Sequence, residues 1–247
     1  MDQPVVLVAL TPEGPVVQFA DSSLNLLTNN SSLMNGSTIS SSTSGTYAYC
    51  FAAGTLISTP DNERAVESLE IGDLILTEAG SHVAVKWIGV QAMQSVFSGL
   101  RSQLVLIRAG ALANGLPHSD LTVTADHGIV IDGYVINAAA LVNGSSIDWI
   151  PAAALERSFA VYHIETEAHD VILANGAPAE TFVDAATRSH FDNYQEYVDL
   201  YGADRLIPEI NRPRISSRRL LPEAIKSRLG IEYERYGRDE LDLVSNF

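Results

Sequence analysis

Short β-branched segments separated by turn residues run through residues 50–181 and leave little room for long helices. The segments are TLIST, DLILT, HVAVKWIGV, QLVLIRAG, LTVTADHGIVI, YVINAAALV, AVYHI and HDVILANG. This composition, punctuated by Gly, Asp and Asn, predicts strands joined by tight turns. Asp132-Gly133 between two apolar runs predicts a type I′ hairpin. We therefore expect an all-β body, in which PAAALER (151–157), with Pro151 in its first turn, is the one predicted short helix.

The segments on either side of this body differ from it in composition. Residues 1–49 contain no Lys or Arg, and NNSSLMNGSTISSSTSGTY predicts a flexible or solvated linker after a short strand. In residues 182–247, RSHFDNYQEYVDLYG and PEAIKSRLG predict two helices. The first presents an apolar face and ends at Gly202; this favours packing on the β body over a docking arm for a partner. The face consists of Phe191, Tyr194, Tyr197, Val198 and Tyr201.

The charge balance excludes some partners. The 247 residues carry a net charge of −15, whereas nucleic acids and anionic membranes require basic surfaces. The local basic patch from Arg212 to Arg219 is most simply a solvated face, and its contact is left open. No apolar run is long enough to span a membrane. The N-terminal apolar stretch lacks a basic flank and so does not read as a standard signal peptide. Localisation stays open between the cytoplasm and export by another route.

Cys50 is the single cysteine of the chain. It excludes an internal disulfide and a multi-cysteine zinc site, and no histidine stands at ligand spacing from it, so we expect no metal or organic cofactor. A lone thiol is either a small buried hydrophobe or a nucleophile. As a nucleophile it can attack an external acyl group, or the carbonyl of its own preceding residue, Tyr49, in an N-to-S acyl shift. The shift needs an activated thiol, an acid for the leaving nitrogen and donors for the oxyanion.

Three blocks in residues 50–176 resemble, in order and spacing, the blocks of Hint (Hedgehog/intein) domains. The first is CFAAGTLIST followed by AVESLEIGDLILTEAG, the second is LTVTADHGIVI, and the third is VYHIETEAHDVILANG. The ANGAPAETFVD ending and the FDNYQEYVDLYG tail look most like bacterial Hint-containing proteins. The resemblance implies a Hint-type (intein/Hedgehog-like) β horseshoe with a small helical C-terminal extension. It divides the chain into an N-terminal segment with linker (1–49), a Hint autoprocessing domain (50–181) and the extension (182–247).

The resemblance also implies roles for individual residues. Cys50 is the nucleophile at the Tyr49–Cys50 bond, Thr124 orients the scissile amide, and His127 protonates its nitrogen. His169 matches the histidine that assists the C-terminal step in inteins, and the turn beside Cys50 is shaped by Gly54 and Thr55.

One position departs from the family pattern. Tyr162-His163 stands where inteins often carry Tyr-Asp, so the aspartate that helps the first step is missing. His163 and Glu165 are the supporting residues that could substitute for it.

The end of the third block does not match an intein. No His-Asn pair and no junction nucleophile follow Gly176, and the chain continues for 71 residues (247 − 176). Asn175-Gly176 reads as a turn dipeptide. SHVAVKWIGV has no acid where sterol transfer would require one. The resemblance therefore implies single-turnover cysteine autoproteolysis without splicing or sterol transfer. The substrate is the chain's own N-terminal segment, and water, a thiol or an amine resolves the thioester.

Two other classes of function remain open. One is a secreted or surface acidic β-domain that acts as a binding or adhesion module and carries a vestigial Hint site. The other is a cysteine hydrolase acting in trans, which the CFAAGT start disfavours because no cysteine-capped helix follows it. The oligomeric state is open.

Overall fold

A six-stranded antiparallel sheet contains the strand that follows Cys50. Its order is β14 (Ile147–Trp149), β10 (Leu104–Ile107), β11 (Leu121–Thr124), β4 (Phe51–Ala52), β15 (Ser158–Glu165) and β9 (Trp87–Gln94). The structure is a computed structural model that describes residues 49–94, 104–182 and 188–231, and the backbone of three N-terminal strands. β4 is only two residues long, yet Phe51 pairs with Val123 on one side and Tyr162 on the other. The chain entering β4 is therefore held by two strands distant in sequence.

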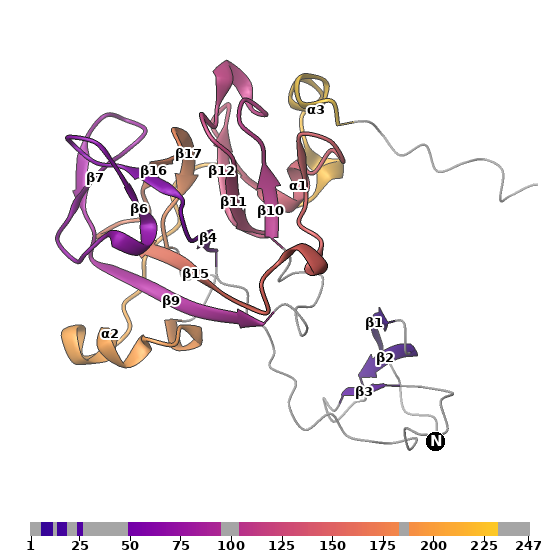
Figure 1. Ribbon diagram of the computed structural model, residues 1–247, viewed down its shortest axis with the longest axis horizontal. Coiled ribbons are helices and arrows are strands. Elements are labelled where there is room, and N and C mark those ends of the chain that lie inside the picture. The colour runs from indigo at the N-terminus through magenta and orange to yellow at the C-terminus, as the bar shows by residue number, and fades with distance from the viewer. Residues whose placement is uncertain are drawn as a thin grey trace, which may run out of the picture. The chain divides into compact units, whose positions relative to one another are not determined.

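The second sheet has seven strands. Its order is β18 (Arg214–Ile215), β13 (Tyr134–Asn137), β12 (Gly128–Ile131), β17 (Ala177–Glu180), β16 (Val171–Ala174), β5 (Leu56–Ser58) and β6 (Glu63–Ala65). β18 runs parallel to β13, and the other pairs in this sheet are antiparallel. A separate hairpin joins β7 (Leu74–Leu76) and β8 (His82–Ala84). In the view of Figure 1, β9 and β15 run as a long pair beneath β4, β10 and β11.

The two predicted turn dipeptides form tight hairpins. Asp132 and Gly133 have φ of 51° and 82°, and Ile131 pairs with Tyr134 across them. Asn175 and Gly176 have φ of 47° and 77° between β16 and β17. Positive φ at both central residues is the geometry of a type I′ turn. The turn predictions from both dipeptides are confirmed.

In the part of the chain that the structure describes, helices are few and short. They are α1 (Ala138–Leu141), α2 (Tyr194–Tyr201), α3 (Glu223–Leu229) and 3-10 turns at Val66–Ser68, Ala113–Gly115, Ala152–Ala154, Arg188–His190 and Arg218–Leu220. The predictions of α2, closed by Gly202 at φ 79°, and of α3 are confirmed. The expected strand YVINAAALV is half wrong, because its Ala-rich second half forms α1; alanine has the highest helix propensity. The expected helix PAAALER is a single 3-10 turn.

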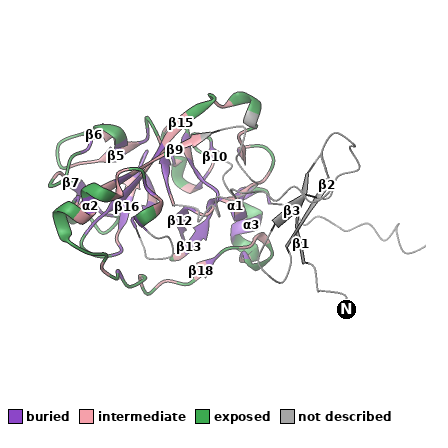
Figure 2. Cartoon of the chain, turned by 90° about the horizontal axis from the view of Figure 1, so that it is seen from below, coloured by how far each residue is buried: buried purple, intermediate pink, exposed green. Residues whose placement is uncertain are grey.

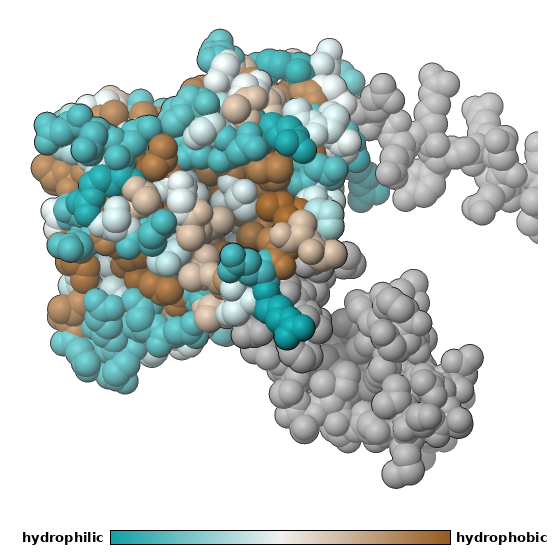
Figure 3. Space-filling model, viewed as in Figure 1, coloured by the Kyte–Doolittle hydropathy of each residue, from teal (hydrophilic) through white to brown (hydrophobic). Residues whose placement is uncertain are grey.

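Most strands of the β body carry buried residues, and α2 has exposed residues on its outer side. Figure 2 shows buried residues along β12, β13 and β16 and exposed ones on α2. On the face drawn in Figure 3, hydrophobic and hydrophilic residues are intermixed over the β body. The main core gathers side chains from both sheets, α1 and α3, whereas a second apolar cluster surrounds Cys50. The prediction of an all-β body with a small helical extension is confirmed.

The C-terminal extension packs on the β body, as its aromatic face predicted. Tyr197 is fully buried, and its ring and that of Phe191 contact Trp87 of β9 edge-on at 5.2 and 5.4 Å between centroids. At the other end, the side chain of Asn143 donates to the carbonyl of Leu229 at 2.7 Å. The described part of the extension is therefore an integral part of this unit.

The N-terminal part forms its own unit, Met1–Gly45. Its sheet joins β1 (Val6–Thr11), β2 (Gly14–Gln18) and β3 (Leu24–Leu26) in that order. The short strand expected near the N-terminus is present, and the predicted linker lies outside the described residues. Among the residues that the structure describes, no helix has the length and apolar character needed to cross a bilayer.

Candidate functional site

Cys50 lies immediately before β4, in the second apolar cluster of the protein. Its side chain is fully buried, and the cluster includes Trp87, Phe182 and Phe191. Burial raises the pKa of the Cys50 thiol well above its ordinary value, because a thiolate is poorly solvated among apolar groups. The thiol is therefore neutral at rest. An external substrate has no access to it in this conformation.

Thr124 holds both sides of Cys50 from the end of β11. The backbone N–H of Cys50 donates to Thr124 Oγ1 at 2.8 Å, and the Cys50 carbonyl accepts from the Thr124 N–H at 2.9 Å. The first bond is made by the nitrogen of the Tyr49–Cys50 amide. This is the atom that the sequence predicted Thr124 to orient.

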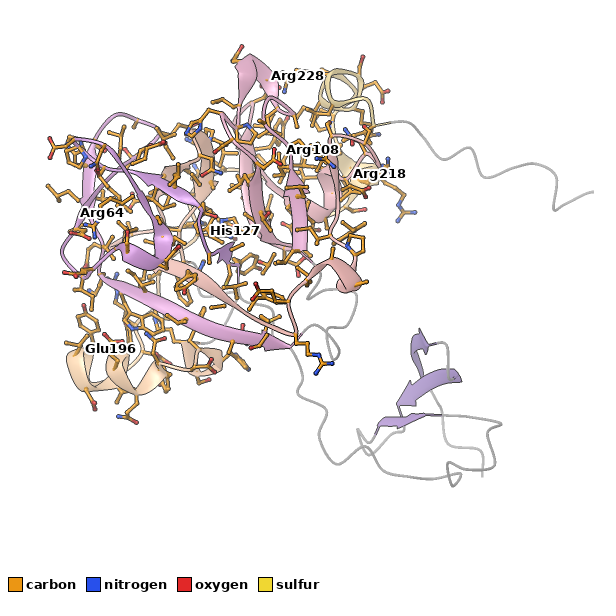
Figure 4. All side chains as sticks on the ribbon, viewed as in Figure 1. Arg64, Arg108, His127, Glu196, Arg218 and Arg228 are labelled. Atoms are coloured by element: carbon orange, nitrogen blue, oxygen red, sulfur yellow. The ribbon has the colours of Figure 1, made fainter. Side chains whose placement is uncertain are left out.

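His127 lies in the turn that follows β11, near the middle of the β body (Figure 4). Its ring is fully buried, packs against Phe51 at 4.2 Å between centroids, and has no hydrogen bond on either nitrogen. Burial lowers the pKa of His127 to about 4, partly opposed by the carboxylate of Glu180 and the backbone of Tyr49. The backbone of Tyr49 is therefore near enough to this imidazole to affect its pKa, although neither ring nitrogen makes a hydrogen bond.

His163, on β15, is a second buried imidazole without a hydrogen bond on either nitrogen. It stacks on Phe191 at 5.9 Å with an interplanar angle of 4°, and contacts Phe182 at 5.1 Å. Both phenylalanines belong to the cluster that contains Cys50. Its ring lies 6.2 Å from that of His127. Burial, followed by the charge of His127, lowers the pKa of His163 well below its ordinary value. The ring is therefore neutral at neutral pH, and one of its nitrogens has a free lone pair.

Glu180, which is buried, and Arg214, which is partly exposed, pair with each other beside this group and were not expected from the sequence. The Glu180 carboxylate accepts from the Gly128 N–H at 2.7 Å and from Arg214 at 2.5 and 3.1 Å. Burial alone would raise the pKa of Glu180, but hydrogen bonds from His169 and Arg214 outweigh it and lower the pKa to about 2. The ionised Glu180 carboxylate thus lies beside Gly128, the residue that follows His127 in the chain.

His169 is bonded on both ring nitrogens. Its Nδ1 accepts from the Ile210 N–H at 3.1 Å, so Nε2 carries the proton and donates to Glu180 at 3.0 Å. The ring orients Glu180 and is joined to the site through it. The structure thus gives His169 a partner that the sequence did not suggest.

The remaining residues predicted from the sequence are Glu165, Gly54 and Thr55. The Glu165 carboxylate is occupied by Arg188 at 2.7 Å and Arg205 at 3.4 Å. Gly54 has φ of 80°, and Thr55 Oγ1 donates to the carbonyl of Ala52 at 2.8 Å, so both shape the turn after β4. The Glu165 carboxylate is therefore engaged by two arginines, and the Gly54 turn adjoins Cys50 in the chain.

Signals for the two missed residues differ. Glu180 is the single acid in the strand APAE and stands next to apolar residues, which is a sequence signal for a buried, paired carboxylate. Arg214 carries no such signal. It reaches the site because β18 pairs with β13, 77 positions from Asn137 at the end of that strand (214 − 137). Among the described residues, no group of three or more His, Cys, Asp or Glu is placed to hold a metal.

Cys50 is buried, Thr124 Oγ1 accepts from its N–H, and two buried imidazoles without hydrogen bonds, His127 and His163, lie in the same β body. The model of the Hint domain family matches residues 49–186, more than half of the chain. The chain belongs to the Hint domain family. The expectation of this family and fold is thereby confirmed.

Solved structures of similar fold include several inteins. The MchDnaB-1 intein is 18% identical, covering 53% of this chain and 99% of its own, with a TM-score of 0.40. A bacterial intein-like domain from Clostridium thermocellum is 16% identical, covering 55% of this chain and 100% of its own, with a TM-score of 0.42. A DnaB intein from Synechocystis sp. PCC 6803 is 13% identical, covering 55% and 100%, with a TM-score of 0.40. A search among curated proteins gave no match.

Proposed function

We propose that this protein cleaves itself at the Tyr49–Cys50 bond through an N-to-S acyl shift, in a single turnover and without splicing. The observation that carries the proposal is the hydrogen bond from the Cys50 N–H to Thr124 Oγ1 at 2.8 Å. It fixes the amide next to a buried thiol and beside an unbonded imidazole, His127. Proximity of this kind converts the attack into an oriented intramolecular step.

The reaction balances within the chain. The Cys50 thiol loses its proton, and sulfur bonds to the Tyr49 carbonyl carbon to form a tetrahedral intermediate. The proton taken from the thiol passes from His163 to His127, which is neutral at rest and whose ring lies 6.2 Å away. His127 then delivers this proton to the Cys50 nitrogen, and the carbon–nitrogen bond breaks. The products are a Tyr49 thioester on the Cys50 sulfur and a free Cys50 amine. Water, a thiol or an amine then displaces the sulfur and releases residues 1–49.

His163 is the better candidate for the base that accepts the thiol proton. Its ring touches Phe182 and Phe191, which belong to the same cluster as Cys50, and its lowered pKa leaves it neutral. Glu165, the other supporting residue expected from the sequence, is engaged by Arg188. With a buried thiol and a neutral base, the proton moves over a short, water-poor path.

The bonding of Asn175 supports cleavage without splicing. Its side-chain oxygen accepts from the Leu56 N–H at 2.7 Å, and its Nδ2 donates to the Asp120 carbonyl at 2.8 Å. Asparagine cyclisation would require this amide nitrogen to attack the chain's own carbonyl. In this turn both ends of the amide clamp neighbouring loops instead. A cleaved chain that keeps its C-terminal extension attached is therefore the expected product.

Intact-mass spectrometry of the purified chain tests the proposal. The wild type and Cys50→Ala are incubated with and without dithiothreitol. We expect a fragment beginning at Cys50 that dithiothreitol increases and that the variant lacks. If every sample keeps its full-length mass after long incubation, self-cleavage is wrong and a binding module with a vestigial site is favoured.

A further inference from the structure

The side chain of residue 49 lies against two groups of the protein. The Tyr49 side chain is half-buried, its ring centroid lies 5.6 Å from the guanidinium carbon of Arg214, and it lies 6.5 Å from the ring of His163. A guanidinium within about 6 Å of an aromatic centroid makes a favourable cation–π contact. Tyr49 is the acyl residue of the bond proposed to break. The protein thus contacts its own substrate on the side chain as well as on the amide.

Arg214 is held rigidly for this contact. The Val135 N–H donates to the Pro213 carbonyl at 3.0 Å, which fixes the β18 backbone against β13. The Arg214 guanidinium makes two hydrogen bonds to Glu180, and its Nε donates to Glu209 at 2.6 Å. A further bond goes from the guanidinium to Asn137 Oδ1 at 3.4 Å. These four bonds leave the face of the guanidinium for an aromatic ring. The side chain is about one-fifth exposed, so water screens the contact only partly.

Arg214 comes from outside the segment that matches the Hint family model, which ends at residue 186. The other groups at the junction, Thr124, His127 and His163, lie inside that segment. The extension therefore adds a contact to residue 49 that the matched segment alone does not contain.

We propose that the C-terminal extension makes the cleavage site selective for an aromatic residue at position 49, and that Arg214 is the specificity-determining residue. This inference rests on the proposed self-cleavage. Holding the Tyr49 ring against the guanidinium fixes the backbone rotation of residue 49. Its carbonyl then faces His127. An aliphatic residue at position 49 loses that orientation and cleaves more slowly.

The test is a ratio of cleavage rates in the full chain. Tyr49→Phe and Tyr49→Leu are compared with dithiothreitol in the wild-type background and in an Arg214→Gln background. A cation–π contact of the usual strength predicts that Phe cleaves about fivefold faster than Leu, and that Arg214→Gln brings the two rates together. General damage to the fold lowers both rates equally and leaves the ratio unchanged. Circular dichroism verifies that each variant is folded.

Arg212→Gln is the matched control, because Arg212 lies on the same segment and pairs with Glu78 at 2.6 Å. It should keep the Phe-to-Leu ratio of the wild type. A ratio that survives Arg214→Gln overturns the inference while leaving self-cleavage intact. No cleavage of the wild-type chain overturns both.

Discussion

The C-terminal extension meets the β body at two buried carboxylates that are alike in chemistry and different in surroundings. At the α2-side contact, Glu165 is engaged by Arg188 and Arg205 of the extension. At the β18-side contact, Glu180 is engaged by Arg214 of the extension, and also by the N–H of Gly128, next to His127. Both carboxylates are fully buried. An arginine paired with a buried carboxylate thus fastens the extension in both places, but only the β18-side contact also adjoins the proposed cleavage residues.

The largest effect on cleavage should come from His127 at the β18 side. Replacing His127 with Gln removes the proposed acid while keeping a planar polar side chain, and loss of an acid–base group typically slows a reaction by about 100-fold or more. His118→Gln is the control, since the His118 ring is partly exposed and pairs with Glu63. The fraction cleaved over time is measured by mass spectrometry.

Circular dichroism separates a chemical role for His127 from a structural one. A folded, uncleaved His127→Gln chain agrees with the proposal. An unfolded chain, or equal cleavage in the two glutamine variants, contradicts a catalytic role.

The largest effect on stability should come from the α2 side. Arg188 is fully buried, with its guanidinium over the rings of Phe182 and Tyr197 at 4.3 and 4.7 Å. Arg188→Leu leaves the Glu165 charge with Arg205, which is more exposed, and should cost about 3 to 5 kcal/mol of unfolding free energy. Urea denaturation measures the loss.

Cleavage of the same variant tests the difference between the two contacts. Well below its unfolding midpoint, Arg188→Leu should cleave faster than Arg214→Gln. If the two arginine variants slow cleavage equally, the distinction between a fastening contact and a site contact is lost.

Local sequence patterns predicted most of the strands and turns but not the short pairings. The β-branched runs and the dipeptides Asp132-Gly133 and Asn175-Gly176 carry their structure locally. β17, with the sequence APAE, lacks β-branched residues, and it is a strand because β12 and β16 pair with it on both sides. β18 has two residues and depends wholly on β13. Tertiary pairing overrides propensity in both cases.

The candidate site divides in the same way. The resemblance to Hint domains led to Thr124 and His127. The structure places Thr124 on the Cys50 amide and the buried His127 ring against Phe51. The sequence did not predict Glu180 and Arg214 at the site, because pairings between strands distant in sequence bring them close to it. The resemblance also offered Glu165 and His163 equally. Only the packing around Phe191 and the ion pair with Arg188 distinguish them.

Acid should weaken the fold through the β18 side in two separate pH ranges. The folded pKa of His127, about 4, lies below its ordinary 6.5, so the unfolded chain takes up the proton first. The stability due to the neutral ring is complete above pH 6.5 and falls by about 3 kcal/mol as the pH drops to 4. Glu180 has a folded pKa of about 2 against 4.5, so its contribution is lost between pH 4.5 and 2.

Urea denaturation at a series of pH values tests these two ranges. His127→Gln should lose less stability than the wild type between pH 6.5 and 4, with the remaining loss in that range due to His163. The loss between pH 4.5 and 2 should remain, because Arg214 and His169 still lower the pKa of Glu180. His118→Gln should follow the wild type throughout. Parallel curves for wild type and His127→Gln would show that the imidazole is not buried as a neutral group.

The smallest effect we predict tests whether the α2 side reaches the site through packing. Gly89 lies on β9 opposite His163, and a Cβ there would lie 2.7 to 2.9 Å from the Phe191 ring. Gly89→Ala must push Phe191 away, at a cost of about 1 to 3 kcal/mol. Because Phe191 stacks on His163, the shift should also slow cleavage.

Gly202→Ala is the matched control for Gly89→Ala. Gly202 has φ of 79° with open space where a Cβ would stand, so alanine there strains only the end of α2, by about 1 kcal/mol. It should lower the unfolding midpoint and leave the cleavage rate unchanged. If Gly89→Ala also changes stability alone, the α2 side only fastens the extension. If Gly89→Ala slows cleavage and Gly202→Ala does not, the α2 side also positions His163, through Phe191. The β18-side contact would then act on the site directly, and the α2-side contact would act on it through packing.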